Sequence, residues 1–292
     1  MDVGIGLPTH IPNVEGKNVI EWARRAEARN FKSLAVIDRI VYGSYEPLIA
    51  LGAAAAVTER IRLITTIILG PIRTNTALFA KQIATLDALS NGRFELGIAV
   101  GQRTDDYSAS GAEFNGRGKA LDRQLAEMRQ IWAGESRGMA GAIGPTPKRK
   151  GGPLVILGGH SEPAFKRAAR IADGWIMGGN ATPEGFQQAA DQFKSTWTAT
   201  GRKDKPRMLA LLYFALGSDA LRGAQHNVRD YYGFAGPYAD QVAAGILSSE
   251  TQIAERIAGL EQVGCDELVL IPGVPDIGQV DLLAAAAFGK QR

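Results

Sequence analysis

Short apolar runs alternate with longer helical patterns along the chain from end to end. The short runs are rich in Val, Ile and Leu and are bounded by Gly, Pro, Asn or Asp, which is typical of buried strands. Eight strands are predicted, at Val3–Leu7, Ser33–Ile37, Ile61–Leu69, Arg93–Val100, Pro153–Gly158, Gly174–Gly178, Arg207–Leu216 and Glu267–Ile271. Helices are predicted between them at Gly16–Arg29, Glu46–Val57, Thr76–Ser90, Gly118–Trp132, Glu162–Ala172, Pro183–Ala199, Asp219–Asp230 and Thr251–Val263, with a last helix at Gln279–Phe288.

This alternation predicts an α/β fold, a (β/α)8 TIM barrel in which nearly every strand is followed by a helix. Barrels of about 250 residues form one domain, so we expect a single domain over residues 1–292. A doubly wound sheet of about five or six strands is the alternative, although it would leave predicted strands over.

Several predicted helix ends carry local signals. Asn91 and Gly92 follow the third helix, where a residue in the left-handed conformation is expected. Ser161 and Thr182 each stand at a helix start with a proline in the first turn, so their hydroxyl groups are expected to cap the helices. Residues 248–250 likewise indicate the start of a helix.

Two connections are longer than usual and are expected at the carboxyl ends of the strands, where barrel enzymes carry their active sites. Residues 101–117 follow the fourth strand, and residues 231–248, rich in Gly, Tyr and Ala, follow the helix after the seventh strand. Residues 133–152 lead into the fifth strand, so we expect them at the opposite end of the barrel.

Neither composition nor charge points to a nucleic acid or a membrane. The net charge is only +3, and the densest basic run, Lys148–Lys150, is expected to be solvated. No apolar stretch of about 18 residues exists, and the first residues lack the pattern of a signal peptide, so we expect a cytoplasmic protein. The lone Cys265 cannot form a disulfide within the chain and is expected to be a core thiol.

A pair of glycine doublets follows the fifth and sixth strands, each just before a helix. Glycine lets backbone N–H groups approach an anion closely, and a helix N-terminus adds about half a positive charge. We therefore expect the two loops to hold one terminal phosphate, although glycines that merely make tight turns are the alternative. The candidate ligands are Gly158, Gly159, His160, Ser161, Gly178 and Gly179.

The inventory of catalytic side chains is small. The three histidines show no metal-ligand spacing, and no nucleophile motif is present, so an organic cofactor is expected to supply the reactivity. His10 follows the first strand and is either a ligand or catalytic contact or a plain surface residue. Asp38 and Arg39 end the second strand, where they either contact cofactor or substrate or form a buried ion pair that closes the strand.

The loop after the fourth strand is expected to cover the substrate. Glycines within it allow movement, and Tyr107 and Phe114, together with Arg103, offer a lid that excludes water. A solvated charged loop, with Asp105 and Asp106 among its charges, is the alternative.

The segment from the third helix to the fourth strand resembles the signature of a known enzyme family. The stretch Ala84–Gly101 resembles the "ATLD-x-LS-x-GR…LG…G" signature of the bacterial-luciferase-like flavin- or deazaflavin-dependent oxidoreductases, and weaker matches lie at Tyr107–Gly118, Ala168–Trp175 and Val263–Leu268. The resemblance implies a (β/α)8 barrel, a cofactor ring at the carboxyl end of the strands, and a phosphate near the loops after strands five and six. Further candidate cofactor contacts are Thr66, Val100 and Gly101.

The sequence departs from the family's catalytic patterns. Deazaflavin-dependent dehydrogenases of this family commonly have Asp-His after strand two, where this chain has Asp38 and Arg39. Their acidic residue after strand four falls on Gln102, and an arginine of luciferase aligns with Val100. The candidate catalytic residues therefore rest on position and are His10, Asp38, Arg39 and Gln102.

Three functions remain open from the sequence. The first is a two-component FMNH2-dependent monooxygenase that acts on a small organic substrate and receives reduced FMN from a separate flavin reductase. The second is hydride transfer with the deazaflavin coenzyme F420, and the third is a non-catalytic flavin-binding barrel. The lack of a nicotinamide-binding fingerprint favours the first, and a homodimer is a further possibility.

Overall fold

The strands of this protein form one closed ring of parallel pairs. A computed structural model describes residues 1–289, and in it the third predicted strand is split in two. The ring runs in the order β3-β2-β1-β9-β8-β7-β6-β5-β4 and closes because β3 also pairs with β5. The strands are β1 (Asp2–Gly6), β2 (Ser33–Val36), β3 (Arg62–Thr65), β4 (Ile68–Leu69), β5 (Phe94–Ala99), β6 (Leu154–Gly158), β7 (Gly174–Met177), β8 (Arg207–Phe214) and β9 (Glu267–Pro272).

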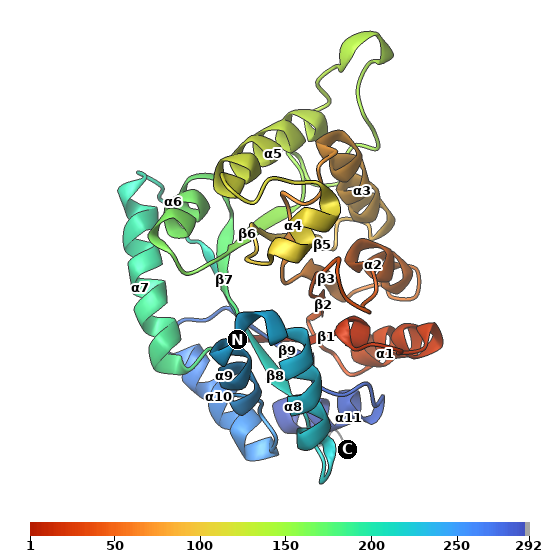
Figure 1. Cartoon of the computed structure of the whole chain (residues 1–292), viewed down its shortest axis with the longest axis vertical. Coiled ribbons are helices and arrows are strands. Elements are labelled where there is room, and N and C mark those ends of the chain that lie inside the picture. Colours follow the sequence, from red (N-terminus) through yellow and green to blue (C-terminus); the bar gives the residue numbers. More distant parts are fainter. Residues whose placement is uncertain (290–292) are drawn as a thin grey trace.

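The predicted (β/α)8 TIM barrel is confirmed. With β3 and β4 taken as one interrupted strand, the barrel has eight parallel strands, and the chain leaves the ladder only at Thr66 and Ile67, which are joined by a cis peptide. Eight helices surround the ring (Figure 1). They are α1 (Gly16–Ala28), α2 (Pro47–Ala55), α3 (Thr76–Leu89), α5 (Arg117–Trp132), α6 (Glu162–Ile171), α7 (Pro183–Ala199), α10 (Glu250–Gln262) and α11 (Gly278–Phe288).

One predicted barrel helix has a different place. The segment Asp219–Asp230 forms α8 (Ala220–Tyr231), but this helix belongs to an excursion that also contains a 3-10 turn (Gly233–Ala235) and α9 (Pro237–Ala244). After the excursion Leu247 returns to the end of β8, where its N–H donates to the Tyr213 carbonyl at 3.0 Å. The helix that completes this barrel unit is therefore α10. We call residues 217–246 the mouth insertion.

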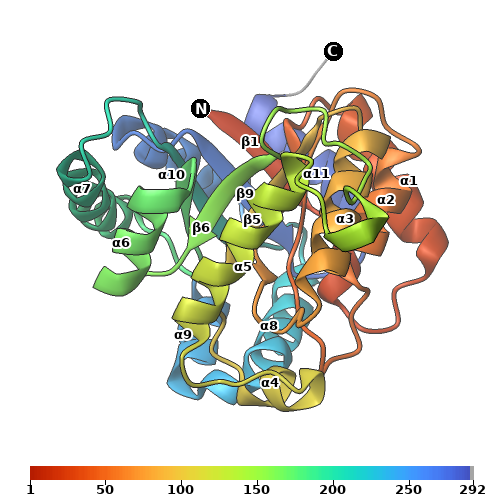
Figure 2. The ribbon, with the colours of Figure 1, turned by 90° about the horizontal axis from the view of Figure 1, so that it is seen from above.

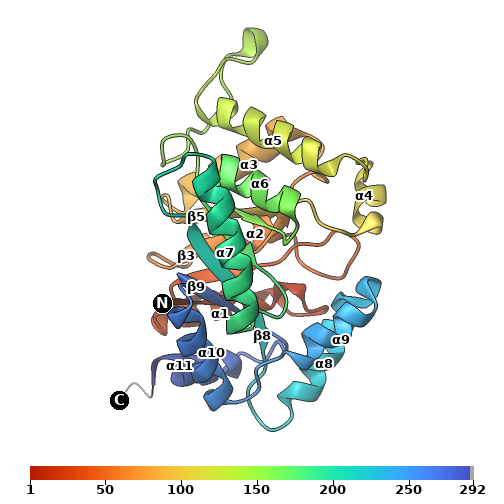
Figure 3. The same ribbon diagram turned by 90° about the vertical axis from the view of Figure 1, so that its left-hand side faces the viewer.

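The long connection after β5 is also partly helical, because it contains α4 (Thr104–Ser110), which sequence reasoning treated as irregular. Helices α4, α8 and α9 gather at one end of the molecule, and the N-terminus lies at the other (Figures 2 and 3). We call the first of these ends, where the strands have their carboxyl ends, the mouth. Within residues 1–289, no helix combines the length and the apolar character needed to cross a bilayer.

The predicted helix signals are confirmed. The side chains of Ser161, Thr182 and Ser249 each accept a hydrogen bond from a backbone N–H in the first turn of α6, α7 and α10. Asn91 and Gly92 have φ values of +55° and +82° after α3. These contacts fix where each helix starts or ends, and thereby which loop residues face the mouth.

The opposite end of the barrel is closed by buried charges. Glu267 is fully buried and is paired with Arg62 at 2.8 Å and with Arg207, and Glu95 lies 2.5 Å from Arg207. A cavity of about 530 Å3 lies beside this cluster and is lined by Arg207 and seven other residues. Residues 133–152 form an arm that projects beyond α5 (Figure 1) and is fastened at this end, as predicted, because the Lys148 N–H donates to Asp87 Oδ2 at 2.6 Å.

The barrel is filled with branched apolar side chains, and the lone thiol lies at its edge. Ile64, Leu211 and Val269 are among the interior residues. At Gly97 an added Cβ would lie 1.8 Å from the Thr65 carbonyl oxygen, so only glycine fits between these strands. Cys265 is buried, which raises the pKa of its thiol to about 12. It is a core residue, as expected.

Candidate active site

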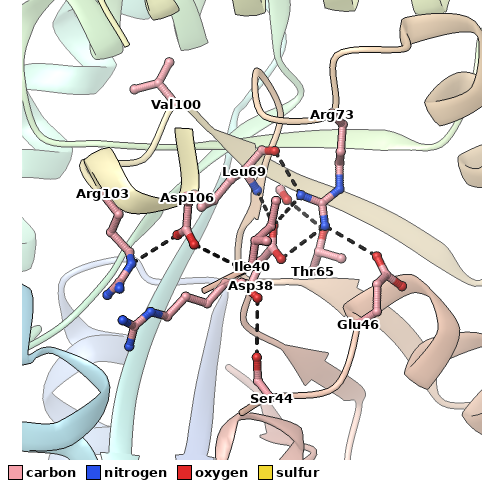
Figure 4. Close-up of polar contacts among 12 residues, drawn as sticks. Asp38, Ile40, Ser44, Glu46, Thr65, Leu69, Arg73, Val100, Arg103 and Asp106 are labelled. Carbon is pink, nitrogen blue, oxygen red and sulfur yellow. Dashed lines mark hydrogen bonds and ion pairs between the residues drawn. The ribbon is translucent and has the colours of Figure 1, made fainter. Parts of the chain in front are cut away.

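Asp38, which follows the second strand, has both of its carboxylate oxygens in hydrogen bonds. Its Oδ2 accepts hydrogen bonds from the Leu69 N–H and from the Arg73 guanidinium, both at 2.8 Å, and its Oδ1 lies 3.1 Å from a second Arg73 nitrogen (Figure 4). Burial raises the pKa of Asp38, and Arg73 opposes that shift. The expected ion pair of Asp38 with Arg39 is wrong, because Arg73 reaches the carboxylate from the loop after β4. Asp38 therefore holds this loop against the end of β2.

Arg39 instead points toward the mouth insertion, where it meets Arg103. Arg39 Nη1 donates to the Tyr231 carbonyl at 2.9 Å, and Arg103 Nη1 donates to the same oxygen at 3.3 Å. Tyr231 ends α8, where the helix dipole places partial negative charge. Asp105 lies between the two guanidinium groups, 3.6 Å from Arg39 and 2.7 Å from Arg103. Two arginines from separate loops thus fasten the end of α8 over the mouth.

Asp106 is a site residue that sequence reasoning did not select. It has no exposed surface. Its Oδ1 accepts from the N–H groups of Ile40 and Val41 at 2.9 and 2.7 Å, and its Oδ2 accepts from Arg103 Nε at 3.1 Å (Figure 4). The alternative of a solvated charged loop is therefore wrong, because this carboxylate finds two backbone donors and a guanidinium group inside the protein. It joins the loop after β2 to α4.

His10 lies deep in the mouth, directly after β1, and only 3% of it is exposed. The plain surface histidine is thus excluded. Its ring stands edge-on between Tyr213 and Tyr231, 5.9 Å from each ring centre. Burial lowers the pKa of His10 to about 4, although the nearby Leu7 and Pro272 carbonyls oppose the shift. Within residues 1–289, neither ring nitrogen has a hydrogen-bond partner of good geometry.

The two glycine doublets are neighbours, as expected from adjacent strands, because β6 pairs with β7. Gly159 and Gly179 have φ values of +123° and +89°, which side chains rarely tolerate. The first loop, with His160 and Ser161, is exposed at the N-terminus of α6. The second lies under the mouth insertion, since a Cβ on Gly179 would lie 2.0 Å from the Tyr238 hydroxyl.

The remaining candidates lie on the rim of the mouth near β3 to β5. Thr66 is buried, and its hydroxyl donates to the Val36 carbonyl at 3.3 Å. Gly101 has a φ of +71°, and its carbonyl accepts from Arg117 Nε at 3.2 Å. Gln102 is exposed. Val100 is half-buried, and its carbonyl accepts a hydrogen bond from a tyrosine of the proposed lid.

The proposed lid is packed against the barrel in this structure. Tyr107 is buried, donates to the Val100 carbonyl, and packs with Leu69. Phe114 stands edge-on to Tyr107 with ring centres 5.2 Å apart, and the Arg117 guanidinium lies 3.9 Å above its ring. The arrangement supplies apolar cover at this side of the mouth, which is what a lid needs, and the lid role itself stays a prediction.

These features fit a flavin or deazaflavin cofactor. The Gly158–Ser161 loop and the α6 N-terminus have the glycines and the helix end that an anion cradle needs, and a Cβ on Gly178 would meet no atom within 4 Å, so open space adjoins it. Tyr231 and Tyr232, with ring centres 5.1 Å apart, give an aromatic wall at the mouth. Nowhere in the described part of the chain do three or more His, Cys, Asp or Glu side chains gather so that they could hold a metal ion.

Comparison with known sequences establishes the family. The sequence model of the luciferase-like monooxygenases matches residues 1–262, so the chain belongs to this family, as its resemblance predicted. An uncharacterized protein of Mycobacterium tuberculosis is 33% identical over 220 residues, which are 72% of this chain and 76% of the relative. An FMNH2-dependent dimethylsulfone monooxygenase of Pseudomonas fluorescens is 25% identical in an alignment of 319 positions, gaps included, that covers 88% of this chain and 86% of the relative.

Solved structures share the fold. An F420-dependent secondary alcohol dehydrogenase, solved with an F420-acetone adduct, has a TM-score of 0.81 at 18% identity and covers 98% of this chain and 99% of its own. The oxygenating constituent of the 3,6-diketocamphane monooxygenase of Pseudomonas putida, solved with FMN, has a TM-score of 0.76 at 15% identity and covers 99% and 97%. The comparisons together support a luciferase-like flavin- or F420-dependent oxidoreductase.

Proposed function

We propose that the protein is the oxygenating component of a two-component, FMNH2-dependent monooxygenase that acts on a small organic substrate in the cytoplasm. A separate flavin reductase would supply the reduced FMN. The relative that is an FMNH2-dependent monooxygenase supports this choice of cofactor. Bound reduced FMN would supply the electrons and, with oxygen, the oxidising chemistry.

The observation that carries the proposal is that none of the candidate side chains after β1 and β2 is well suited to act as a general base near pH 7. The carboxylate of Asp38 is held by Arg73 and the Leu69 N–H. Arg39 stays protonated, and burial lowers the pKa of His10 to about 4, well below the range of an effective base. Oxidation of an alcohol by hydride transfer needs a base for the hydroxyl proton, whereas oxygenation by a reduced flavin does not draw on one from these positions.

Each part of the mouth has a role in this proposal. The Gly158–Ser161 loop binds the FMN phosphate through backbone N–H groups at the start of α6. Arg39 and Arg103 hold the mouth insertion closed through the Tyr231 carbonyl. The tyrosines of the insertion then exclude water from the reacting centre.

The second candidate is an F420-dependent reductase. Reduction delivers a hydride to the substrate and needs no base. It is therefore as compatible as oxygenation with an Asp38 carboxylate that is held by Arg73. The non-catalytic flavin-binding barrel would share the cofactor site and differ only in showing no turnover.

Anaerobic titration of the purified protein with reduced FMN and with reduced F420 tests the choice. We expect reduced FMN to bind more tightly in this titration and, in a separate aerobic assay with a flavin reductase, an oxygenated product to form from the substrate. Binding of reduced F420 that is tighter by tenfold or more, about 1.4 kcal/mol, would overturn the proposal. Flavin binding without an oxygenated product from any of a panel of organic substrates would instead support the non-catalytic barrel.

A further inference from the structure

We infer that Thr9 and His10 form the polar end of the substrate site, and that this site selects an uncharged organic molecule with an apolar body and one hydrogen-bonding oxygen. The inference rests on the proposed function, because it takes the mouth as the place where substrate binds. It goes further by naming the class of molecule and the two side chains that orient it.

The first argument is that three arginines of the mouth, Arg39, Arg73 and Arg103, are already paired with its carboxylates. Arg73 is bound to Asp38, and Arg103 is bound to Asp105 and Asp106. Arg39 lies against Asp105 and the Tyr231 carbonyl. An anionic substrate would have to take a guanidinium group from one of these partners, and a cationic substrate would have to take a carboxylate. An uncharged molecule disturbs none of these pairs.

The second argument is that polar atoms beneath these pairs lack partners. Thr9 and His10 are 1% and 3% exposed. Among residues 1–289, the Thr9 hydroxyl and both His10 nitrogens have no hydrogen-bond partner. A neutral imidazole has one N–H, so even if a carbonyl of Leu7 or Pro272 receives it, the other nitrogen remains an acceptor without a donor. Buried polar groups are rarely left unpaired, and each exception calls for an explanation such as a functional role or an ordered water.

The third argument is the apolar character of the surroundings. Tyr213 and Tyr231 present ring edges to His10. Large exposed apolar side chains stand on both sides of the mouth, on the loop after β2 and on the mouth insertion. They are Ile40, Val41, Tyr45, Phe234 and Tyr238. A ligand that approaches His10 from the mouth would meet these side chains, so its body is best apolar.

The test uses the whole chain without cofactor and three probes of similar size: acetophenone, benzoate and benzylamine. The protein has three histidines, so 15N-histidine labelling gives a simple NMR spectrum, and the His10→Phe variant assigns the signals of His10. We expect acetophenone to shift the His10 signals and leave those of His160 and His226 in place. The two charged probes at equal concentration should shift none of them.

Three variants separate binding from folding. His10→Phe keeps an aromatic ring between the tyrosines but removes both unpartnered nitrogens. We therefore expect its melting temperature to be unchanged or higher. Its binding of acetophenone, measured by ligand-observed NMR, should be at least tenfold weaker. His226→Asn, on the exposed side of α8, is the matched control and should bind as the unaltered protein does. His10→Asn, which keeps a donor and an acceptor, should recover part of the lost affinity.

Two outcomes would overturn the inference. One is benzoate or benzylamine binding as tightly as acetophenone. The other is no shift of His10 with acetophenone either in the unaltered protein or in Tyr232→Ala, which removes a ring that contacts both tyrosines beside His10. The reduced-FMN titration is run on the same samples, so loss of cofactor binding, which would contradict the proposed function, is seen separately from loss of probe binding.

Discussion

Replacing Asp106 with alanine should loosen the whole rim of the mouth. The variant removes the acceptor of the Ile40 and Val41 N–H groups and one of the two acidic partners of Arg103. Hydrogen bonds to a charged group contribute about 1.5–3 kcal/mol each, and breaking a buried ion pair costs about 3–5 kcal/mol. Arg103 keeps Asp105, and the freed N–H groups can reach water after a local shift. We therefore expect a loss of about 3 kcal/mol in the free energy of unfolding.

Denaturant and thermal unfolding check this value. A loss of about 3 kcal/mol corresponds to a melting temperature lower by about 5 °C for a chain of this size. The control is Glu113→Ala, an exposed residue in the same loop, which should change the free energy of unfolding by less than about 0.5 kcal/mol. A loss below about 1 kcal/mol for Asp106→Ala would show that this carboxylate does not hold the loops together.

Three further predictions concern the cofactor, pH and the lid. The double variant Gly159→Val, Gly179→Val should weaken reduced-FMN binding by several kcal/mol, measured by fluorescence titration. The control is Gly151→Val, which imposes similar backbone strain (φ of +85°) in open space far from the mouth and should leave the affinity for reduced FMN unchanged. Because the pKa of His10 is lowered to about 4 in the folded protein, the unfolded chain takes up its proton first as pH falls below about 6.5. The His10 contribution to stability is therefore complete above that pH and should fall by about 2 kcal/mol by pH 5, and an identical pH dependence in His10→Phe would contradict this. Phe114→Ala should raise the hydrogen peroxide formed per oxygen consumed in the proposed reaction, and an unchanged yield would argue against the lid.

The barrel itself could be predicted because its signals are local. Each strand is a short apolar run, and each cap at Ser161, Thr182 and Ser249 is set by the residue and its near neighbours. The same local signals gave a wrong prediction for α8, which was expected to be the barrel helix after the seventh strand. A helical pattern directly after a strand looks the same whether the helix packs on the barrel or lies over its mouth, and only the return of Leu247 to β8 distinguishes them.

The site was harder to predict because its contacts join distant parts of the chain. Asp38 pairs with a residue 35 positions away rather than with its neighbour Arg39, and no periodicity encodes such a pair. Asp106 looked like one of several charges in a polar loop, yet it is buried because Ile40 and Val41 supply backbone donors from another loop. The order of glycines and strands did predict that the two doublets are neighbours, since parallel strands that follow one another in a barrel lie side by side.

The mouth insertion leaves and rejoins the barrel at almost the same point. The Ala215 N–H donates to the Leu247 carbonyl at 2.9 Å, so the two ends of residues 217–246 are already held together by the sheet. Closing a loop costs entropy that grows only slowly with its length, so a segment with fixed ends can change in length with little extra loop entropy. Such changes can be made in its exposed part, around the 3-10 turn, without altering the residues that pack on the barrel, such as Val228 and Val242. Exchange of that part between relatives would test whether the insertion sets the substrate preference.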